Sequence, residues 1–595
     1  MSSGPSVLRD RLVGFFREVS AWAQRPWIAY PAIALFQLKV LWGAWIFRDL
    51  TQGDTASYFQ RALLWHQYGQ VDLIWSPLYT SFYGWFYGIT GDVYAATVLH
   101  RVLIVILVTL LVLALFRRLL SPSVAWLAAA WWAIIPFNFD VFEVHLFAIL
   151  PLVATPLAVL IWPGPWGRGI ALAIMAGAAV LVRNEMAVVA ALLAILFLSW
   201  EARYAARFEN RAPYSLRVYG MAYGVPVAVS GALVFFFVTR SVIPLSVLQR
   251  AYLPKHTINM CQAYAFGYKQ RHPEWTKDHW TECSELMQAR FGEPYPSLWT
   301  MIRRNPRAVL GHFAWNLRLL PGGTQLSLFG AMSGSVTPDY NPVPVERRRS
   351  LLESGILMVL IAAGLIAWNR QRVTSGRRPS GEHVIGWLAL SPAAAVALLL
   401  IVPTQRPRPE YLYGLSLPII TAAAWGADVL IQRWGVLDRL GLWMPVMMVL
   451  PFLVFGTYFA PPPGQSPRRP LLETIRRLEP YHDRISAPGA VFLAGHHAFS
   501  LDGYMVRPRV EPQPRVLGNE VLSRLDDTEP VEIFLERFGV NLFYIDEGVS
   551  SRFRTNPLHR SFLDNLGANG WRPLASEWTG ADEWLLVIRN QSVNP

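Results

Sequence analysis

The chain has 595 residues, of which 53% are hydrophobic, 13% aromatic and only 16% charged. A soluble protein carries about 25% charged residues, and long apolar runs recur here, so the composition excludes a soluble globular protein and indicates a polytopic membrane protein. The net charge of +13 comes from Arg and Lys gathered between the apolar runs. This is the positive-inside pattern and not a nucleic-acid-binding surface.

The first 26 residues are basic and carry apolar residues at helical spacing from Val7 to Trp22. We expect residues 1–26 to form an amphipathic helix on the inner membrane surface. The apolar run 27–47 is too long for the core of a signal peptide and has no small-residue cleavage site, so it should stay as the first span.

A membrane helix needs about 20 apolar residues. By this criterion we expect a helical membrane protein with about eleven spans. They are 27–47, 98–116, 122–137, 141–161, 168–184, 186–200, 219–240, 351–368, 384–403, 411–432 and 441–460.

The Arg-rich segments between spans set the orientation. With the N-terminus inside, the short inner segments contain Arg117, Arg168, Arg203, Arg370 and Arg433, each close to further Arg residues. The outer segments are then 48–97, 138–140, 183–186, 241–350, 404–410 and 461–595, and the chain is N-in and C-out.

The first outer loop carries a carboxylate, Asp54, within a few residues of the end of the first span. An ionisable group at this depth is a functional candidate. Asp54 could act as a general base, because partial desolvation at the interface raises a carboxylate pKa, or it could cap the helix expected over 55–65. Many aromatic residues follow, and they predict two interfacial helices on either side of Gly69.

The outer loop 241–350 contains both cysteines of the chain, Cys261 and Cys283. On an oxidising side of the membrane they can form a disulfide worth about 3 kcal/mol, the alternative being two free thiols. We expect helices near 276–290 and 298–319 and a mobile Gly- and Pro-rich loop over 321–345.

From residue 461 the composition is that of a soluble protein. Buried strands are expected at 490–494, 542–545 and 584–588, with helices at 528–538 and 559–569. This predicts a small C-terminal α/β domain over 461–595. Neighbouring histidines, His496 and His497, fit a surface or loop position better than a metal site, because no further ligand pattern accompanies them.

Four places in the chain carry a family resemblance. They are Gly53-Asp54-Thr55 with the downstream Ser76-Pro77-Leu78-Tyr79, Arg101 at the start of the next helix, Leu181-Val182-Arg183-Asn184-Glu185, and Arg406–Tyr411 ahead of a Leu- and Pro-rich helix. With the soluble domain that closes the chain, they resemble the GT-C superfamily of membrane glycosyltransferases, which includes protein O-mannosyltransferases and the lipid A aminoarabinose transferase.

The resemblance implies that Asp54 is the general base, that the donor is a sugar on a polyprenyl monophosphate, and that the product is inverted. Thr55 stands where many members carry a second acid. The implied enzyme is a hexosyl- or pentosyltransferase in the bacterial inner membrane, whose active site faces the periplasm or exterior. Its partners would be membrane lipids, the lipid donor and a glycan, lipid or protein acceptor, without nucleic acid.

A phosphate leaving group needs cations, and arginine suits it best. The candidates on the outer side are Arg101, Arg183, Lys255, Arg406 and Arg408. For Arg183 the alternative is a structural ion pair with Glu185 or Asp140, and for the 406–408 loop it is contact with lipid headgroups.

Asp140, Glu143 and His145 at the start of the fourth span could bind a divalent cation or orient the acceptor. An acidic cluster paired with Arg183 is the simpler alternative. Glu410 and Tyr411 are further candidates for donor or acceptor contacts, and Glu185 for structural support.

Two other classes of function compete with the enzyme. A transporter or lipid flippase is less favoured because no internal repeat of interrupted helices is detected, and a large outer loop and domain are unnecessary for transport. A non-catalytic scaffold is opposed only by the polar residues gathered on the outer face.

Overall fold

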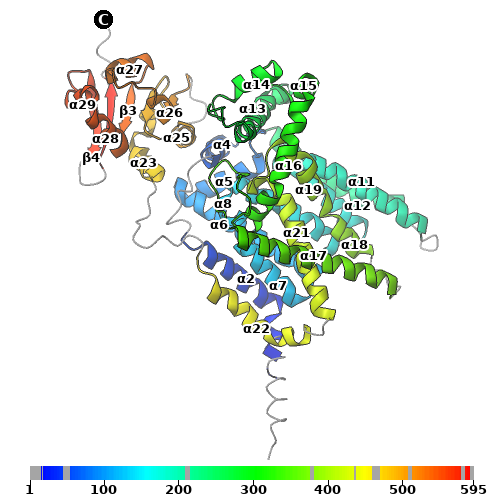
Figure 1. The fold of residues 1–595 in the computed structure, drawn as a ribbon. Helices are drawn as coiled ribbons and strands as arrows, with labels where there is room; N and C mark the ends of the chain where they lie inside the picture. Colours follow the sequence, from blue (N-terminus) through cyan, green and yellow to red (C-terminus); the bar gives the residue numbers. More distant parts are fainter. Residues whose placement is uncertain are drawn as a thin grey trace, which may run out of the picture. The chain divides into compact units, whose positions relative to one another are not determined.

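The computed structural model describes residues 15, 18–19, 21–43, 54–207, 215–374, 381–433, 437–457, 470–496, 498–506, 512–577 and 583–589. The chain is mostly helical and forms two compact units (Figure 1). The first unit comprises Met1–Ala44, Asp72–Tyr79 and Arg101–Ala460, and the second comprises Trp45–Val71, Thr80–His100 and Pro461–Pro595.

Seven helical segments in the described part of the chain are long and apolar enough to cross a membrane. They are Val93–Leu119, Glu143–Ile161, Met186–Arg203, Leu216–Val238, Arg347–Ala367, Val384–Thr404 and Tyr413–Arg433. Four shorter apolar helices are Pro26–Leu41, Pro122–Ile134, Pro165–Leu181 and Pro445–Val454. Each of the eleven predicted spans overlaps one of these helices, and the chain is an integral membrane protein. Its orientation stays a prediction.

The apolar helices belong mainly to the first unit. Their bounds are α2 (Pro26–Leu41), α6 (Val93–Leu119), α7 (Pro122–Ile134), α9 (Glu143–Ile161), α10 (Pro165–Leu181), α11 (Met186–Arg207), α12 (Leu216–Val238), α17 (Arg347–Thr374), α18 (Gly381–Leu388), α19 (Ser391–Val396), a π-helical turn (Ala397–Ile401), α20 (Val402–Thr404), α21 (Tyr413–Arg433) and α22 (Leu437–Val454). The predicted amphipathic helix over 1–26 lies largely outside the described residues.

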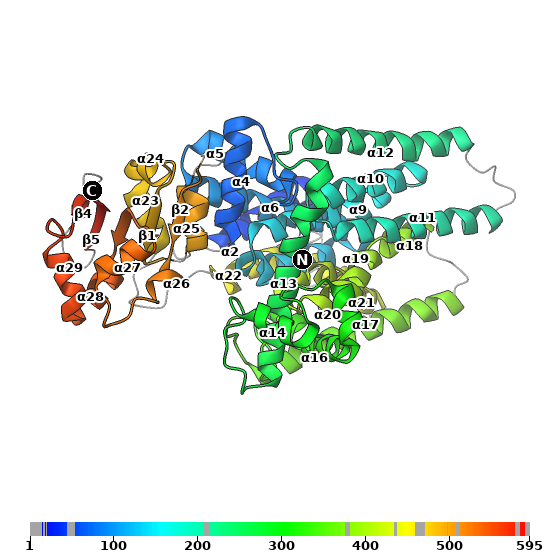
Figure 2. The ribbon, with the colours of Figure 1, turned by 90° about the horizontal axis from the view of Figure 1, so that it is seen from above.

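Glycine allows the membrane helices to pack closely, as small residues do in bilayers. A Cβ atom on Gly169 of α10 would lie 2.0 Å from the carbonyl oxygen of Ala222 in α12, and one on Gly426 of α21 would lie 1.9 Å from the carbonyl oxygen of Leu360 in α17. Helices α10, α11 and α12 run side by side in Figure 2. Backbone contact of this kind fixes the helices that carry the site residues.

The segment 241–350 is helical over most of its length. It contains α13 (Leu245–Arg271), α14 (Cys283–Phe291), α15 (Leu298–Arg304) and α16 (Pro306–Phe329). A disulfide joins Cys261 to Cys283 and so connects α13 with α14, as the sequence allows. Asn305 caps α16 by accepting a hydrogen bond from the Ala308 amide, and Pro306 follows at its first position.

The prediction of a loop over 321–345 is wrong for its first part, because helix α16 continues to Phe329. Pro321 lies inside this helix, and Gly323 packs against the loop that follows α20. A Cβ atom on Gly323 would lie 1.9 Å from the Pro407 carbonyl oxygen. Gly323 therefore allows close packing between the helix and the loop. The Gly- and Pro-rich composition of 321–345 does not distinguish this use of glycine from a mobile loop.

The second unit contains two helices of the first outer loop, α4 (Asp54–Tyr68) and α5 (Pro77–Thr90), of which α5 enters it at Thr80. They lie on either side of Gly69, as predicted. They pack together through Gly84, whose Cβ atom would lie 2.5 Å from the Ala62 carbonyl oxygen, and through the rings of Phe59 and Tyr83, whose centroids are 5.6 Å apart.

The C-terminal part of the second unit is an α/β domain. Its five strands have the order β2-β1-β3-β5-β4, with β1 parallel to β2 and β3 and with β5 antiparallel to its neighbours. The strands are β1 (Val491–Ala494), β2 (Arg515–Leu517), β3 (Leu542–Ile545), β4 (Trp571–Glu577) and β5 (Trp584–Arg589). The three predicted strands are β1, β3 and β5, and the sequence missed the exposed β2 and β4.

Helices surround this sheet (Figure 1). They are α23 (Pro470–Leu478), α24 (His482–Ile485), α25 (Ala498–Met505), α26 (Asn519–Leu522), α27 (Val531–Arg537), α28 (Glu547–Thr555) and α29 (Pro557–Asp564). Helices α27 and α29 correspond to the two predicted helices. Their buried side chains, among them Phe534 and Phe562, join Phe543 and Val587 of the sheet in one apolar core.

Candidate functional site

A buried imidazole within electrostatic range of three cations marks the candidate site in the first unit. His145 lies in the first turn of α9 with 5% of its surface exposed. Its Nδ1 atom has no hydrogen-bond partner among the described residues. Arg183, Lys255 and Arg408 all lie within electrostatic reach of the ring. We call these three residues the cation cluster.

Arg183 reaches the site from the turn between α10 and α11. It forms an ion pair with Glu185, which also accepts a hydrogen bond of 3.1 Å from the Tyr413 hydroxyl. The structural pair with Glu185 considered above is therefore present. The ion pair fixes the position of the guanidinium. Because the two side chains keep 15–19% exposure, a ligand can still reach it.

Arg408 lies on the loop between α20 and α21, next to the short turn Pro409–Tyr411. It forms an ion pair with Glu410, and its guanidinium lies 4.4 Å from the centre of the Tyr340 ring and 5.6 Å from that of Tyr411. Burial acts to lower the pKa of Arg408, but Glu410 and, to a smaller extent, Tyr411 and Asp339 outweigh it and raise the pKa. The group is a permanent cation with a fixed plane.

Lys255 of α13 lies over the ring of Trp75, with Nζ 3.4 Å from the ring centre. The next residue, Ser76, has φ of +53° and donates a hydrogen bond of 2.7 Å to the Val182 carbonyl, directly before Arg183. This contact fastens the Trp75 turn to the Arg183 turn.

Backbone strain is concentrated around the cation cluster. Among the described residues, Ser76 and Arg406 are the two non-glycine residues with positive φ, at +53° and +129°. Such conformations cost about 1–3 kcal/mol and tend to occur at functional sites. Ser76 follows Trp75, which contacts Lys255, and it is bonded to Val182, directly before Arg183. Arg406 lies two residues before Arg408, so both strained residues flank the cluster.

Two of the predicted phosphate ligands, Arg406 and Arg101, are buried among acceptors of the protein itself, and their role toward phosphate stays a prediction. Arg406 is fully buried, and its guanidinium donates hydrogen bonds to the Pro338 and Thr337 carbonyls and to the Gln270 side chain. Burial lowers the pKa of Arg406 to about 10. These contacts attach the loop after α20 to the segment 337–340.

Arg101 of α6 is 2% exposed and forms a buried ion pair with Glu143 at 2.5 Å. It also donates to the carbonyls of Asn138, Phe139 and Val141. Arg101 and Glu143 thus anchor the short helix α8 (Phe137–Asp140) and the start of α9. The side chain of Asp140 lies outside the described part of the structure.

Asp54 belongs to the second unit, where it is the first residue of α4 and is half-buried. A carboxylate in the first turn interacts favourably with the helix dipole, so the helix-start role is compatible with the fold. The role of general base stays a prediction.

Metal ligands are not gathered anywhere in the described ranges, where no three His, Cys, Asp or Glu side chains stand together as a metal group. In the C-terminal domain, His496 is hydrogen-bonded to Thr474 at 2.8 Å and lies 3.8 Å from Asp546. His496 therefore connects α23 with the ends of β1 and β3. His497 lies outside the described residues.

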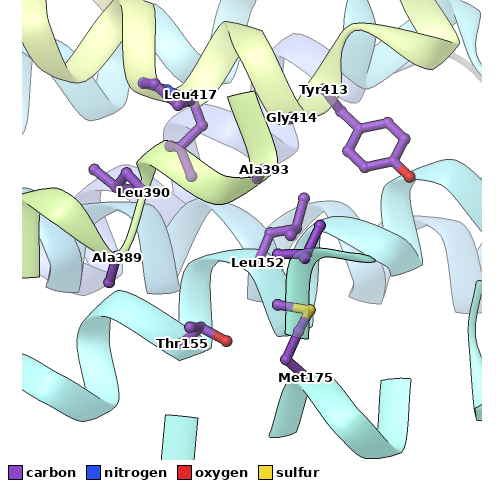
Figure 3. A pocket seen from close by; sticks show the side chains of 11 residues that line it. Leu152, Thr155, Met175, Ala389, Leu390, Ala393, Tyr413, Gly414 and Leu417 are labelled. Carbon is purple, nitrogen blue, oxygen red and sulfur yellow. The ribbon is translucent and has the colours of Figure 1, made fainter. Parts of the chain in front are cut away.

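Two small apolar hollows lie side by side, and one of them reaches Glu185, the partner of Arg183. This one is lined by Glu185, Tyr411 and Tyr413 at one side and by apolar residues of α9, α11 and α19 at the other. It shares Tyr413 and Gly414 with the second hollow, shown in Figure 3, whose walls are formed mainly by apolar side chains such as Leu152, Met175 and Leu417. An apolar space thus begins beside charged groups.

The sequence missed several residues that shape this site. Tyr340 and Asp339 from the loop after α16 lie against Arg408, and Tyr413 binds Glu185. Asp339 and Tyr340 are far from Arg408 in sequence, and Tyr413 opens an apolar helix, so no local pattern marked any of the three. Trp75 and Ser76 belonged to a segment already noted for its aromatic residues.

No family model and no curated protein matches the sequence. The fold is similar to that of an oligosaccharyltransferase from Archaeoglobus fulgidus tethered to an acceptor peptide, with 13% identity and a TM-score of 0.48 over 97% of this chain and 75% of that one. It is also similar to ArnT from Cupriavidus metallidurans bound to undecaprenyl phosphate, with 10% identity and a TM-score of 0.33 over 96% and 98% of the chains. Both are GT-C membrane glycosyltransferases.

Proposed function

We propose that the chain is an inverting membrane glycosyltransferase that moves a sugar from a polyprenyl-phosphate donor to a hydroxyl of a cell-envelope acceptor. The observation that carries this proposal is the cation cluster around the unpaired Nδ1 of His145. Three cations held near one buried polar atom form a suitable binding place for an anion, and a fork-shaped guanidinium fits phosphate oxygens.

In the proposed reaction the acceptor oxygen attacks the anomeric carbon as Asp54 takes the hydroxyl proton. The bond between that carbon and the phosphate oxygen breaks, and its electron pair stays with the polyprenyl phosphate. The cation cluster stabilises the negative charge that grows on the leaving phosphate. A single displacement of this kind inverts the anomeric centre. The role of Asp54 rests on its position in the first outer loop and on the family resemblance.

The donor lipid requires an apolar surface next to its phosphate. The hollow lined by Tyr411, Tyr413 and apolar residues begins beside Glu185, the partner of Arg183. We infer that the first isoprene units of the donor enter here. The Arg bias of the inner segments supports a reaction on the outer face of the membrane, and the family resemblance implies that this is a bacterial inner membrane.

Native mass spectrometry with undecaprenyl phosphate tests the phosphate site. The wild type should retain the lipid, and the double variant Arg183→Gln/Lys255→Gln should lose about 10-fold or more in affinity, because a hydrogen bond to a charged group is worth about 1.5–3 kcal/mol. Arg304→Gln is the matched control, because this exposed arginine is paired with Glu293 at 3.6 Å and is not a member of the cluster. Equal retention by the wild type and the double variant would refute the site, and retention of neutral polyprenol as strong as that of the phosphate would exclude phosphate recognition.

A further inference from the structure

The C-terminal domain makes close backbone contact with the helix that carries Asp54. Within the second unit, α25 packs against α4, and Gly503 is the point of nearest approach. A Cβ atom on Gly503 would lie 2.3 Å from the Ala56 carbonyl oxygen and 2.9 Å from the Ala56 Cβ. Any side chain at this position would therefore push the two helices apart.

Two further contacts reinforce this packing. The ring of Tyr504 lies 5.2 Å from the ring of Phe59, and Gln60 donates a hydrogen bond of 3.5 Å to the carboxylate of Asp502. Ala56, Phe59 and Gln60 have the spacing i, i+3 and i+4, so they share one face of α4. Three successive residues of α25 thus contact one face of α4.

The opposite face of α4 carries the proposed base. Asp54 precedes Ala56 by two positions, which corresponds to about 200° around a helix of 3.6 residues per turn. Helix α25 therefore supports the back of α4, while Asp54 points away from that contact. A displacement at Gly503 would move the carboxylate together with its helix.

A second helix of the domain contacts the start of α6. Leu472 of α23 packs with Tyr94 and Val98, and the Arg476 guanidinium lies 5.7 Å from the centre of the Tyr94 ring. The domain thus touches two separate segments of the second unit through α23 and α25. Contact at two places restrains rotation of the domain about either one.

We propose that the C-terminal domain positions Asp54 by holding α4 through α25, and that Gly503 is the positioning residue. This inference rests on the proposed function, because it assigns the domain a task in the transfer reaction. A displacement of about 1 Å at a catalytic group can cost on the order of 100-fold in rate. The affinity for the donor phosphate should not change, because the cation cluster belongs to the first unit.

The test compares Gly503→Ala with Gly567→Ala in the full chain in lipid nanodiscs. Gly567 lies in the same domain, and a Cβ atom there has nothing within 4 Å. Gly503→Ala should lower kcat by about 10- to 100-fold, keep the donor KM within about twofold of wild type, and raise hydrogen exchange in the α4 peptide. Gly567→Ala should match the wild type in all three measurements.

An unchanged kcat and unchanged α4 exchange in Gly503→Ala would overturn the inference, as would an equal rise in the donor KM. If exchange rises throughout the sheet, the variant has unfolded the domain, and Tyr504→Leu takes its place. This variant removes the ring beside Phe59 without adding a clash, and it should reproduce the kcat loss and the local rise in exchange; wild-type values in both would overturn the inference. Full transfer activity in Asp54→Asn would instead refute the proposed base, whatever the Gly503 variants show.

Discussion

Replacement of Arg408 should weaken donor binding in a graded way. Its guanidinium lies between the rings of Tyr340 and Tyr411 and is paired with Glu410, so its plane is fixed before a phosphate arrives. A hydrogen bond to a charged group is worth about 1.5–3 kcal/mol. Arg408→Gln should therefore raise the Kd for undecaprenyl phosphate by about 10- to 150-fold. Arg408→Lys keeps the charge but loses the planar guanidinium, with its paired donors and its stacking on the tyrosine rings. Its Kd for undecaprenyl phosphate should therefore lie between those of the wild type and Arg408→Gln.

Glu410, the buried ion-pair partner of Arg408, gives the single variant a second effect, on folding stability. Removing one member of a buried ion pair leaves the other charge uncompensated, at a cost of about 3–5 kcal/mol in folding stability. The double variant Arg408→Gln/Glu410→Gln removes both charges and should restore the melting temperature without restoring binding. Titration with undecaprenyl phosphate and a thermal melt separate the two effects. Wild-type affinity in Arg408→Gln, or full recovery of affinity in the double variant, would refute the assignment.

Three further predictions concern other parts of the chain. Asp54→Asn should lower kcat by about 10²- to 10⁴-fold, the usual worth of a general base, while donor affinity measured by titration stays at the wild-type value. Replacing both Cys261 and Cys283 by Ser opens a loop with a sequence separation of 22 residues, and it should cost about 3 kcal/mol of stability in a denaturant or thermal melt. Burial lowers the pKa of His279 to about 4 in the folded chain. As pH falls below 6.5, His279 is therefore protonated in the unfolded chain while it stays neutral in the folded chain. Stability should therefore decrease between pH 6.5 and 4, by at most about 3 kcal/mol, and His279→Phe should remove that part of the slope.

Each of these three predictions has a clear contrary result. Weakened donor binding in Asp54→Asn would make this residue a donor ligand and not the base. An unchanged melt in the double Cys variant would show that the packing of α13 on α14 suffices without the disulfide. A pH slope that is the same in His279→Phe and wild type would assign the acid sensitivity to other groups.

Hydropathy predicted the membrane helices well, because one property, the length of an apolar run, decides them. Helices of mixed polarity carry no long apolar run, so hydropathy does not reveal them. Helix α13 (Leu245–Arg271) has mixed polarity along its whole length, and its stability comes from packing against α14 and α16 and from the disulfide. Strands β2 and β4 were missed for a related reason, since neither carries the continuous apolar run that revealed β3.

The sequence also identified the kinds of residue in the site but could not sort their roles. Five outer cations looked equivalent in sequence. Burial separates them, since Arg101 and Arg406 are enclosed by carbonyl and side-chain acceptors, while Arg183 and Arg408 keep partial exposure near His145. Tertiary contacts decide this distinction, and no local pattern encodes them.

Following the lipid donor itself shows whether this protein transfers a sugar from a polyprenyl phosphate. Lipids from cells that lack this protein are incubated, together with envelope acceptors, with purified protein and analysed by mass spectrometry. We predict that one polyprenyl-phosphate sugar disappears while an equal amount of polyprenyl phosphate appears, and that Asp54→Asn leaves the extract unchanged. A lipid profile that stays the same with the wild-type protein would refute the proposed transfer, and one that changes equally with Asp54→Asn would refute the proposed base.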